Sequence, residues 1–224
     1  MRDAKNYAER EKFRSRRGRR DGEAGRGARP SPGDDLAALW ERQWPACPPQ
    51  AHKLKHVYRD RWVRFHSLPE SQRYPGTEAE YDIVLDRCNT VLDELFRGQE
   101  VRIVTTDWSG TSEPPALSAQ HSLWNPGARH WATVRANEDE IDPDFITYTH
   151  LYASRSRWRT GLVDGLLRAV ADDLTANVMI ASLSFDRVHH PYDGGADVLL
   201  PMAGERDRLK SRHVDWLSDH PLGF

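Results

Sequence analysis

The chain has 224 residues, of which 38% are hydrophobic and 29% are charged, and its formal net charge is −2. This composition is typical of a soluble globular protein, and no run approaches the roughly 18 apolar residues that are needed to span a bilayer. The arginine-rich start lacks the apolar segment of a secretory signal, so we expect a cytoplasmic protein without membrane segments.

The charge is distributed unevenly along the chain. Residues 1–33 hold eleven Lys or Arg against five Asp or Glu, so they carry +6 and residues 34–224 carry −8. Arginines interleaved with Gly and Ser, and the lack of an apolar stripe, predict that residues 1–33 form a disordered basic tail. The tail is open to three interpretations: a nucleic-acid-binding arm, a solubilising tail, or a translation start placed too far upstream. Nucleic-acid binding is the weaker one, because arginines without aromatic stacking or a fold-level motif are a weak signal.

The first half of the chain predicts two helices and a strand between them. A short helix is expected from an N-cap at Asp34 or Asp35 to residue 43, and residues 61–66 read as a mixed strand. The clearest helix runs from Thr77 to about residue 97, because Thr77 and Glu80 fit a capping box and apolar residues recur at helical spacing. Gly98 is its expected stop signal.

The second half reads mainly as strands. We predict strands at 101–108, 130–135, 144–152 and 178–183, a hairpin at 188–192 and 196–200, and helices at 160–174 and 204–217. Residues 109–127 read as one long loop, and the carboxylates of residues 138–144 read as a solvated turn. This order predicts an α+β protein with an antiparallel β-sheet and helices packed mainly on one face. Residues 34–224 are therefore expected to form a single domain after the tail.

Polar and titratable side chains are densest in the predicted hairpin at residues 188–200. Glycine is expected to supply positive φ angles in its Asp-Gly-Gly turn. We select four hairpin residues as the candidate functional group and three residues as supporting candidates; these are His190, Tyr192, Asp193 and Asp197, supported by Arg64, His66 and Trp108. The competing interpretation is structural: Asp193 serves the turn, and the histidines are hydrogen-bonded members of a strand.

The motifs of the common enzyme classes are missing. The chain has no nucleotide-binding glycine loop, no Gly-x-Ser-x-Gly elbow and no His-Glu-x-x-His motif. Its two cysteines, Cys47 and Cys88, also argue against a disulfide scaffold and a structural zinc site. A metal-dependent hydrolase that uses the hairpin is the remaining catalytic alternative, with His66, Asp107 and His130 as conceivable additional ligands. Because neighbouring strand residues face opposite sides, His189 and His190 cannot both bind one ion without a bulge.

Three segments resemble one bacterial family. They are Arg64 to Ser71 continuing through Arg73-Tyr74-Pro75, His190 to Val198, and Trp216-Leu217-Ser218, and they resemble the domain-of-unknown-function family 3885. The resemblance covers about residues 35–224 and implies a small intracellular α+β protein of the kind found in actinobacteria, without an assigned activity or cofactor. Val188-His189 stands where that family usually has an aromatic-rich strand, so His189 is not taken as a site residue.

The preferred functional interpretation is a non-catalytic, immunity-like protein that binds a basic protein partner or a small ligand. A body of charge −8 suits a basic partner. Several tryptophans at segment ends or in loops are candidate anchors of an interface, although each can equally fill the core (Trp108, Trp124, Trp131 and Trp158).

Overall fold

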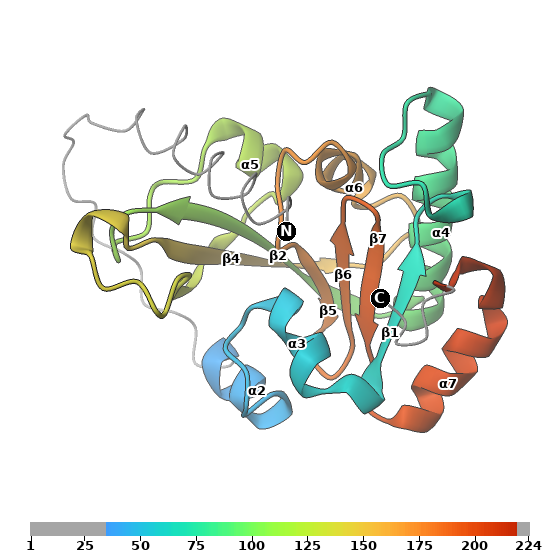
Figure 1. The fold of residues 1–224 in the computed structure, drawn as a ribbon, viewed down its shortest axis with the longest axis horizontal. Coiled ribbons are helices and arrows are strands. Elements are labelled where there is room, and N and C mark those ends of the chain that lie inside the picture. Colours follow the sequence, from blue (N-terminus) through green and yellow to red (C-terminus); the bar gives the residue numbers. More distant parts are fainter. Residues whose placement is uncertain (1–34, 219–224) are drawn as a thin grey trace.

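The computed structural model describes residues 35–218 and contains one seven-stranded sheet (Figure 1). The sheet has the order β1-β7-β6-β5-β2-β4-β3, and every neighbouring pair is antiparallel. The strands are β1 (Trp62–His66), β2 (Glu100–Ser109), β3 (Arg129–Arg135), β4 (Tyr148–Arg157), β5 (Met179–Ser182), β6 (Val188–Tyr192) and β7 (Gly195–Leu199). The predicted antiparallel α+β class is confirmed. The basic tail of residues 1–33 lies outside the described residues.

Helices cover both faces of the sheet, and the larger group lies on one of them. The helices are α2 (Leu36–Gln43), α3 (Ala51–Val57), α4 (Glu78–Phe96), α5 (Ala119–Trp124), α6 (Asp164–Ala171) and α7 (Ala203–Arg212). Helices α4, α6 and α7 bury their apolar sides against one face, and α5 adds Trp124 to that core. The short helices α2 and α3 pack on the opposite face. Along each strand, alternate residues therefore enter different cores.

Helix α4 forms where the sequence predicts it. The hydroxyl of Thr77 accepts the backbone N–H of Glu80, and the Glu80 carboxylate accepts the N–H of Thr77 in return. The apolar stripe that follows includes Leu92 and Phe96, which are fully buried. Gly98 adopts a φ of 76° just after the helix, as a C-terminal stop requires.

Other predicted boundaries were wrong. Residues 109–127 are not one loop, because they contain α5, which begins at its N-cap Ser118. Strand β4 begins at Tyr148 rather than at residue 144, because residues 143–145 form a 3-10 turn that starts with a proline. Helix α3 has no counterpart in the predicted elements. Helix α6 is shorter than predicted, and α7 ends at Arg212 before a separate 3-10 turn.

The predicted β6–β7 hairpin is present, but the role expected of its glycines was wrong. Neither Gly194 nor Gly195 has φ in the left-handed region. Instead, a Cβ atom added at Gly195 would lie 2.2 Å from the carbonyl oxygen of Phe65 on β1. Glycine is needed at this position because the neighbouring strand approaches closely, not because the turn is tight.

None of the helices in the described part of the chain is both long and apolar enough to cross a membrane. Tryptophans that were expected as candidate anchors contribute to the core instead. Trp158 is buried, and Trp124 and Trp131 pack against the two cores.

Candidate functional site

Three of the candidate residues form one row across the sheet. Asp197 on β7 pairs with Arg64 on β1 on one side and with His190 on β6 on the other. Because the three residues are in register, their side chains project from the same face, which is the face covered by α2 and α3. The sequence placed Arg64 and Asp197 in one group without indicating that they touch.

Asp197 is the centre of this row and is almost completely buried, with 1% of its surface exposed. Its carboxylate accepts hydrogen bonds from Arg64 Nε at 2.8 Å and Nη2 at 3.0 Å, and from Trp62 Nε1 at 2.8 Å. Lys55 Nζ lies 3.4 Å from the second oxygen. Burial by itself raises the pKa of Asp197, but the hydrogen bonds from Arg64 and the nearby positive charges outweigh burial and lower it.

The two hairpin histidines face opposite sides of the sheet, as predicted from strand geometry. His190 Nδ1 lies 2.8 Å from the carbonyl oxygen of Val178, and it therefore carries the proton that this bond requires. Burial lowers the pKa of His190 to about 4 and that of His189 to about 3. Both imidazoles are thus neutral at pH 7.

Helix α3 supplies two polar neighbours that the sequence prediction missed. Lys55 contacts Asp197, and His52 forms a 2.7 Å hydrogen bond through Nδ1 with the side chain of Asn177. Burial lowers the pKa of His52. His52 and Lys55 stand three positions apart on one helix face, a spacing that would have grouped them if the helix had been predicted.

The remaining candidates are distributed along the edge of this row or away from it. The Arg64 guanidinium lies 4.7 Å from the ring centre of Tyr192, whose pKa is raised by burial. Asp193 points away into a surface cluster, where it accepts hydrogen bonds from Arg73 and Tyr74. His66 ends β1 beside Gly195.

Trp108 is not part of the row. It lies on β2, which β5 separates from β6, and it pairs with Thr149 on β4. Within the described residues, the strand of Trp108 therefore does not adjoin the hairpin that Trp108 was predicted to support.

The row offers a poor donor set for a metal ion. Both oxygens of Asp197 already accept hydrogen bonds from positively charged groups, and Nδ1 of His190 is directed at a backbone carbonyl. In residues 35–218, no three His, Cys, Asp or Glu residues gather as a metal-binding group. In this row Arg64 and Asp197 form an ion pair between β1 and β7, and His190 on β6 is hydrogen-bonded to the Val178 carbonyl oxygen.

A second polar row, which sequence analysis did not group, lies on the opposite face near β3. The Ser109 hydroxyl is 2.8 Å from His150 Nε2, and the Thr133 hydroxyl is 2.9 Å from both His150 Nδ1 and His130 Nε2. Asp107 pairs with His150 across β2 and β4. Asp107 and His130 were considered as partners of His190, but they belong to this separate row. Burial lowers the pKa of His150, so its imidazole is neutral at pH 7.

Two exposed apolar side chains, one of them the most exposed among the described residues, belong to the connection between β3 and β4, residues 136–147, which we call the acidic hairpin loop. It lies at one end of the sheet and is drawn in yellow in Figure 1. Ile141 is 91% exposed and Phe145 is 55% exposed. The loop also contains five carboxylates and no Lys or Arg (Glu138, Asp139, Glu140, Asp142 and Asp144).

Hydrogen bonds give the acidic hairpin loop a defined conformation. The Asn137 side chain donates to the carbonyl oxygen of Phe145 at 2.7 Å and accepts from the N–H of Thr147 at 2.9 Å. Lys53 of α3 forms a 2.8 Å ion pair with Glu138, which lowers the pKa of that carboxyl and ties the loop to the body. These contacts fix the backbone of the loop, and the side chains of Ile141 and Phe145 stay exposed to solvent.

Comparison with known proteins identifies one family. A family model described as "Domain of unknown function (DUF3885)" matches residues 50–221. This range includes all seven strands and helices α3 to α7. Comparisons with curated proteins and with solved structures give no match.

Proposed function

The chain belongs to the DUF3885 family, and we propose that it is a non-catalytic binding protein whose acidic hairpin loop docks a basic protein partner. The observation that carries this proposal is the pairing of two exposed apolar side chains, Ile141 and Phe145, with a surrounding set of carboxylates. Apolar anchors inside a polar rim are the usual anatomy of a protein–protein interface.

Ile141 and Phe145 expose much of their apolar surface, and its removal from water would favour association with a partner. Phe145 and Ile141 lie four residues apart in a braced loop, so a partner would not need to order them on binding. Each side chain is large enough to act as an anchor that fills a pocket on the partner.

The charge of the chain supports a basic partner. The loop carries five carboxylates, and residues 34–224 carry −8 in total. Complementary fields accelerate the encounter of two proteins and exclude partners of the same sign. Glu138 is held by Lys53, which leaves four carboxylates, and we assign three of them, Asp139, Asp142 and Asp144, to the partner.

The chemistry of the His190 hairpin supports a binding role rather than a catalytic one. Its central carboxylate is buried and paired, and its two histidines are neutral and enclosed. A general acid or base must reach its substrate directly or through one water molecule. In this arrangement Asp197 ties β7 to β1 and to Lys55 of α3, and His190 ties β6 to Val178, which stabilises the fold that presents the loop.

The test starts from proteins that the immobilised full chain captures from its source cells. A captured protein is scored only after it has been purified and its direct binding has been measured by calorimetry. The Ile141→Ser and Phe145→Ser variants should each weaken that binding about 30-fold, which corresponds to the ~2 kcal/mol of an interface anchor. Neutralising Asp139, Asp142 and Asp144 with Asn should slow association and reduce its dependence on salt.

Matched controls separate the loop from general surface effects. Leu174→Ser and Met202→Ser also remove exposed apolar side chains, which are 51% and 60% exposed, but they lie outside the loop. They should leave the affinity within twofold of wild type. The proposal fails if no captured protein binds directly, if the partner is acidic, or if the control variants weaken binding as much as the loop variants do.

A further inference from the structure

One stretch of the chain has the chemistry that the acidic hairpin loop requires of a partner. Residues 13–20, which we call the basic segment, hold Phe13 and five arginines and contain neither Asp nor Glu (Arg14, Arg16, Arg17, Arg19 and Arg20). The basic segment lies outside the described residues. In composition, an aromatic side chain among positive charges is complementary to Ile141 and Phe145 among carboxylates.

The acidic hairpin loop remains negative after the cations that contact it are counted. Lys53 pairs with Glu138. The Arg135 guanidinium donates to the backbone carbonyl oxygen of Glu140. Five carboxylates against these two cations leave three negative charges on the loop. Hydrogen bonds from backbone N–H groups to carboxylates within the loop remove none of this charge.

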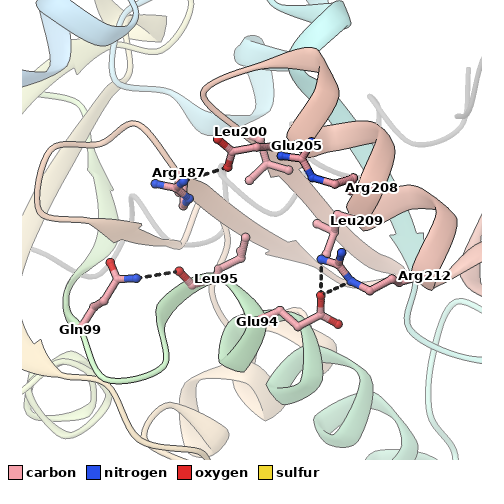
Figure 2. A pocket seen from close by; sticks show the side chains of 9 residues that line it. All are labelled: Glu94, Leu95, Gln99, Arg187, Leu200, Glu205, Arg208, Leu209 and Arg212. Atoms are coloured by element: carbon pink, nitrogen blue, oxygen red, sulfur yellow. Dashed lines mark hydrogen bonds and ion pairs between the residues drawn. The ribbon is translucent and has the colours of Figure 1, made fainter.

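Residues 138–144 are the most acidic run of seven residues in the described range 35–218, with five carboxylates. The carboxylates beside helix α7 are in a different situation, because Glu94 pairs with Arg212 and Glu205 pairs with Arg187 (Figure 2). Within the described chain, the loop therefore offers a basic segment the densest negative charge.

The connection between the basic segment and the described domain is long enough to reach the loop of the same molecule. The domain begins at Asp35, the N-cap of α2. Helix α2 contacts β3 through Trp40 and Trp131, whose ring centres are 5.8 Å apart. The loop starts five residues after Trp131, which is about 17 Å along the strand. The fourteen residues 21–34 can span up to about 46–50 Å.

We propose that the basic segment binds the acidic hairpin loop of its own molecule and competes there with the basic partner. The competition rests on the proposed function of the loop, whereas the contact does not. A short tether gives an effective concentration in the millimolar range, so an affinity as weak as about 1 mM fills about half of the loops. The apparent affinity of the loop for a partner then falls about twofold, because only unoccupied loops can bind.

Paramagnetic NMR of the full chain tests the contact without any partner. A nitroxide is attached to the Ser15→Cys variant, in which the native Cys47 and Cys88 are buried. It should reduce the amide signals of residues 138–145 to less than half of their intensity, and 0.5 M NaCl should restore them because salt screens exposed charges. Helix α7 contacts β1 at the other end of the sheet, so its signals should keep their intensity and serve as the reference.

Two triple variants provide the matched comparison for the contact. One replaces the three loop aspartates with Asn, which keeps the side-chain oxygen that accepts the Asp144 N–H, and should restore the loop signals at low salt. The other removes three exposed carboxylates outside the loop and should leave the broadening unchanged (Asp60→Asn, Asp82→Asn and Asp215→Asn). The contact is overturned if the loop signals keep their intensity, if both variants behave alike, or if the broadening arises only between a nitroxide-labelled and an isotope-labelled molecule.

Competition is measured by titrating the full chain with hexa-arginine. Replacing the five arginines of the basic segment with Gln should tighten binding of this probe at least twofold. The same replacement in the triple variant of the loop aspartates should have no effect, which separates competition from the change in net charge. An unchanged affinity, or an equal gain in both backgrounds, overturns the competition. Capture and calorimetry of a partner test the proposed function separately, so the two failures are distinguishable.

Discussion

Replacing His189 with leucine should make the protein more stable, although the residue lies in the centre of a strand. His189 is fully buried, and neither ring nitrogen has a hydrogen-bond partner among the described residues. Its neighbours in register, Ile180 and Val198, belong to the apolar core of that face. An unsatisfied buried polar group costs about 1–3 kcal/mol, so His189→Leu should raise the free energy of unfolding by about that amount at pH 7.5.

The gain should increase in acid. Burial lowers the pKa of His189 from 6.5 to about 3, so the unfolded chain binds a proton below pH 6.5 that the folded chain does not. The stability that depends on the neutral ring is complete above pH 6.5 and is lost as the pH falls towards 3. At 1.36 kcal/mol for each pH unit, the loss between pH 6.5 and pH 5 is about 2 kcal/mol, and the leucine variant avoids it.

Urea unfolding at pH 7.5 and pH 5 measures both effects. The other histidines with lowered pKa values contribute equally to the wild type and the variant, so the difference between the two proteins reports His189 alone. His190→Leu is the contrasting control, because it removes a hydrogen bond to Val178 and should destabilise the protein at pH 7.5. A leucine variant that is less stable than wild type at both pH values, or that keeps the wild-type pH dependence, would refute the reasoning.

Three further sets of substitutions, each measured by urea unfolding, test the contacts that hold β1, β7 and helix α4 in place. Arg64→Met removes the bidentate partner of the Asp197 carboxylate, which is 1% exposed and keeps only Trp62 and Lys55 among its described contacts, and should lower the free energy of unfolding by about 3 kcal/mol. Adding Asp197→Leu should restore part of this loss, and no recovery would contradict the pairing. Gly195→Ala should destabilise by more than about 1 kcal/mol because its Cβ meets a backbone oxygen, while Gly165→Ala in α6 meets nothing within 4 Å and should stabilise by about 0.5–1 kcal/mol. Thr77→Ala removes the capping box of α4 and should cost about 1 kcal/mol; an unchanged midpoint would exclude that role.

Sequence patterns predicted the elements whose signals are local. Helix α4 has a capping box, a long apolar stripe and a glycine stop, so its ends were placed within one residue. The strand predicted at residues 61–66 is present as β1. Helix α3 was missed because its seven residues offer only Ala51 and Leu54 for burial, too few to show a helical period.

Local sequence patterns could not predict which residues of the candidate site contact each other. Arg64 and Asp197 are 133 residues apart, and their contact depends on β1 joining the sheet beside β7. The same limit hid the Ser109–His150 contact, because β2 and β4 meet only in the folded sheet. The exposure of Ile141 and Phe145 was hidden for a different reason, because an apolar residue next to carboxylates gives no sign of whether it turns inward.

The pairing of β1 with β7 also has a consequence during synthesis. At about 5–20 residues per second, the ribosome needs roughly 7–27 s to make the 133 residues that separate Arg64 from Asp197. During that interval β1 has been made but β7, the one strand that pairs with it within residues 35–218, has not, so Trp62 and Phe65 cannot yet take up their buried positions. The nascent chain therefore presents an unpaired strand to chaperones, and translation speed sets how long this exposure lasts.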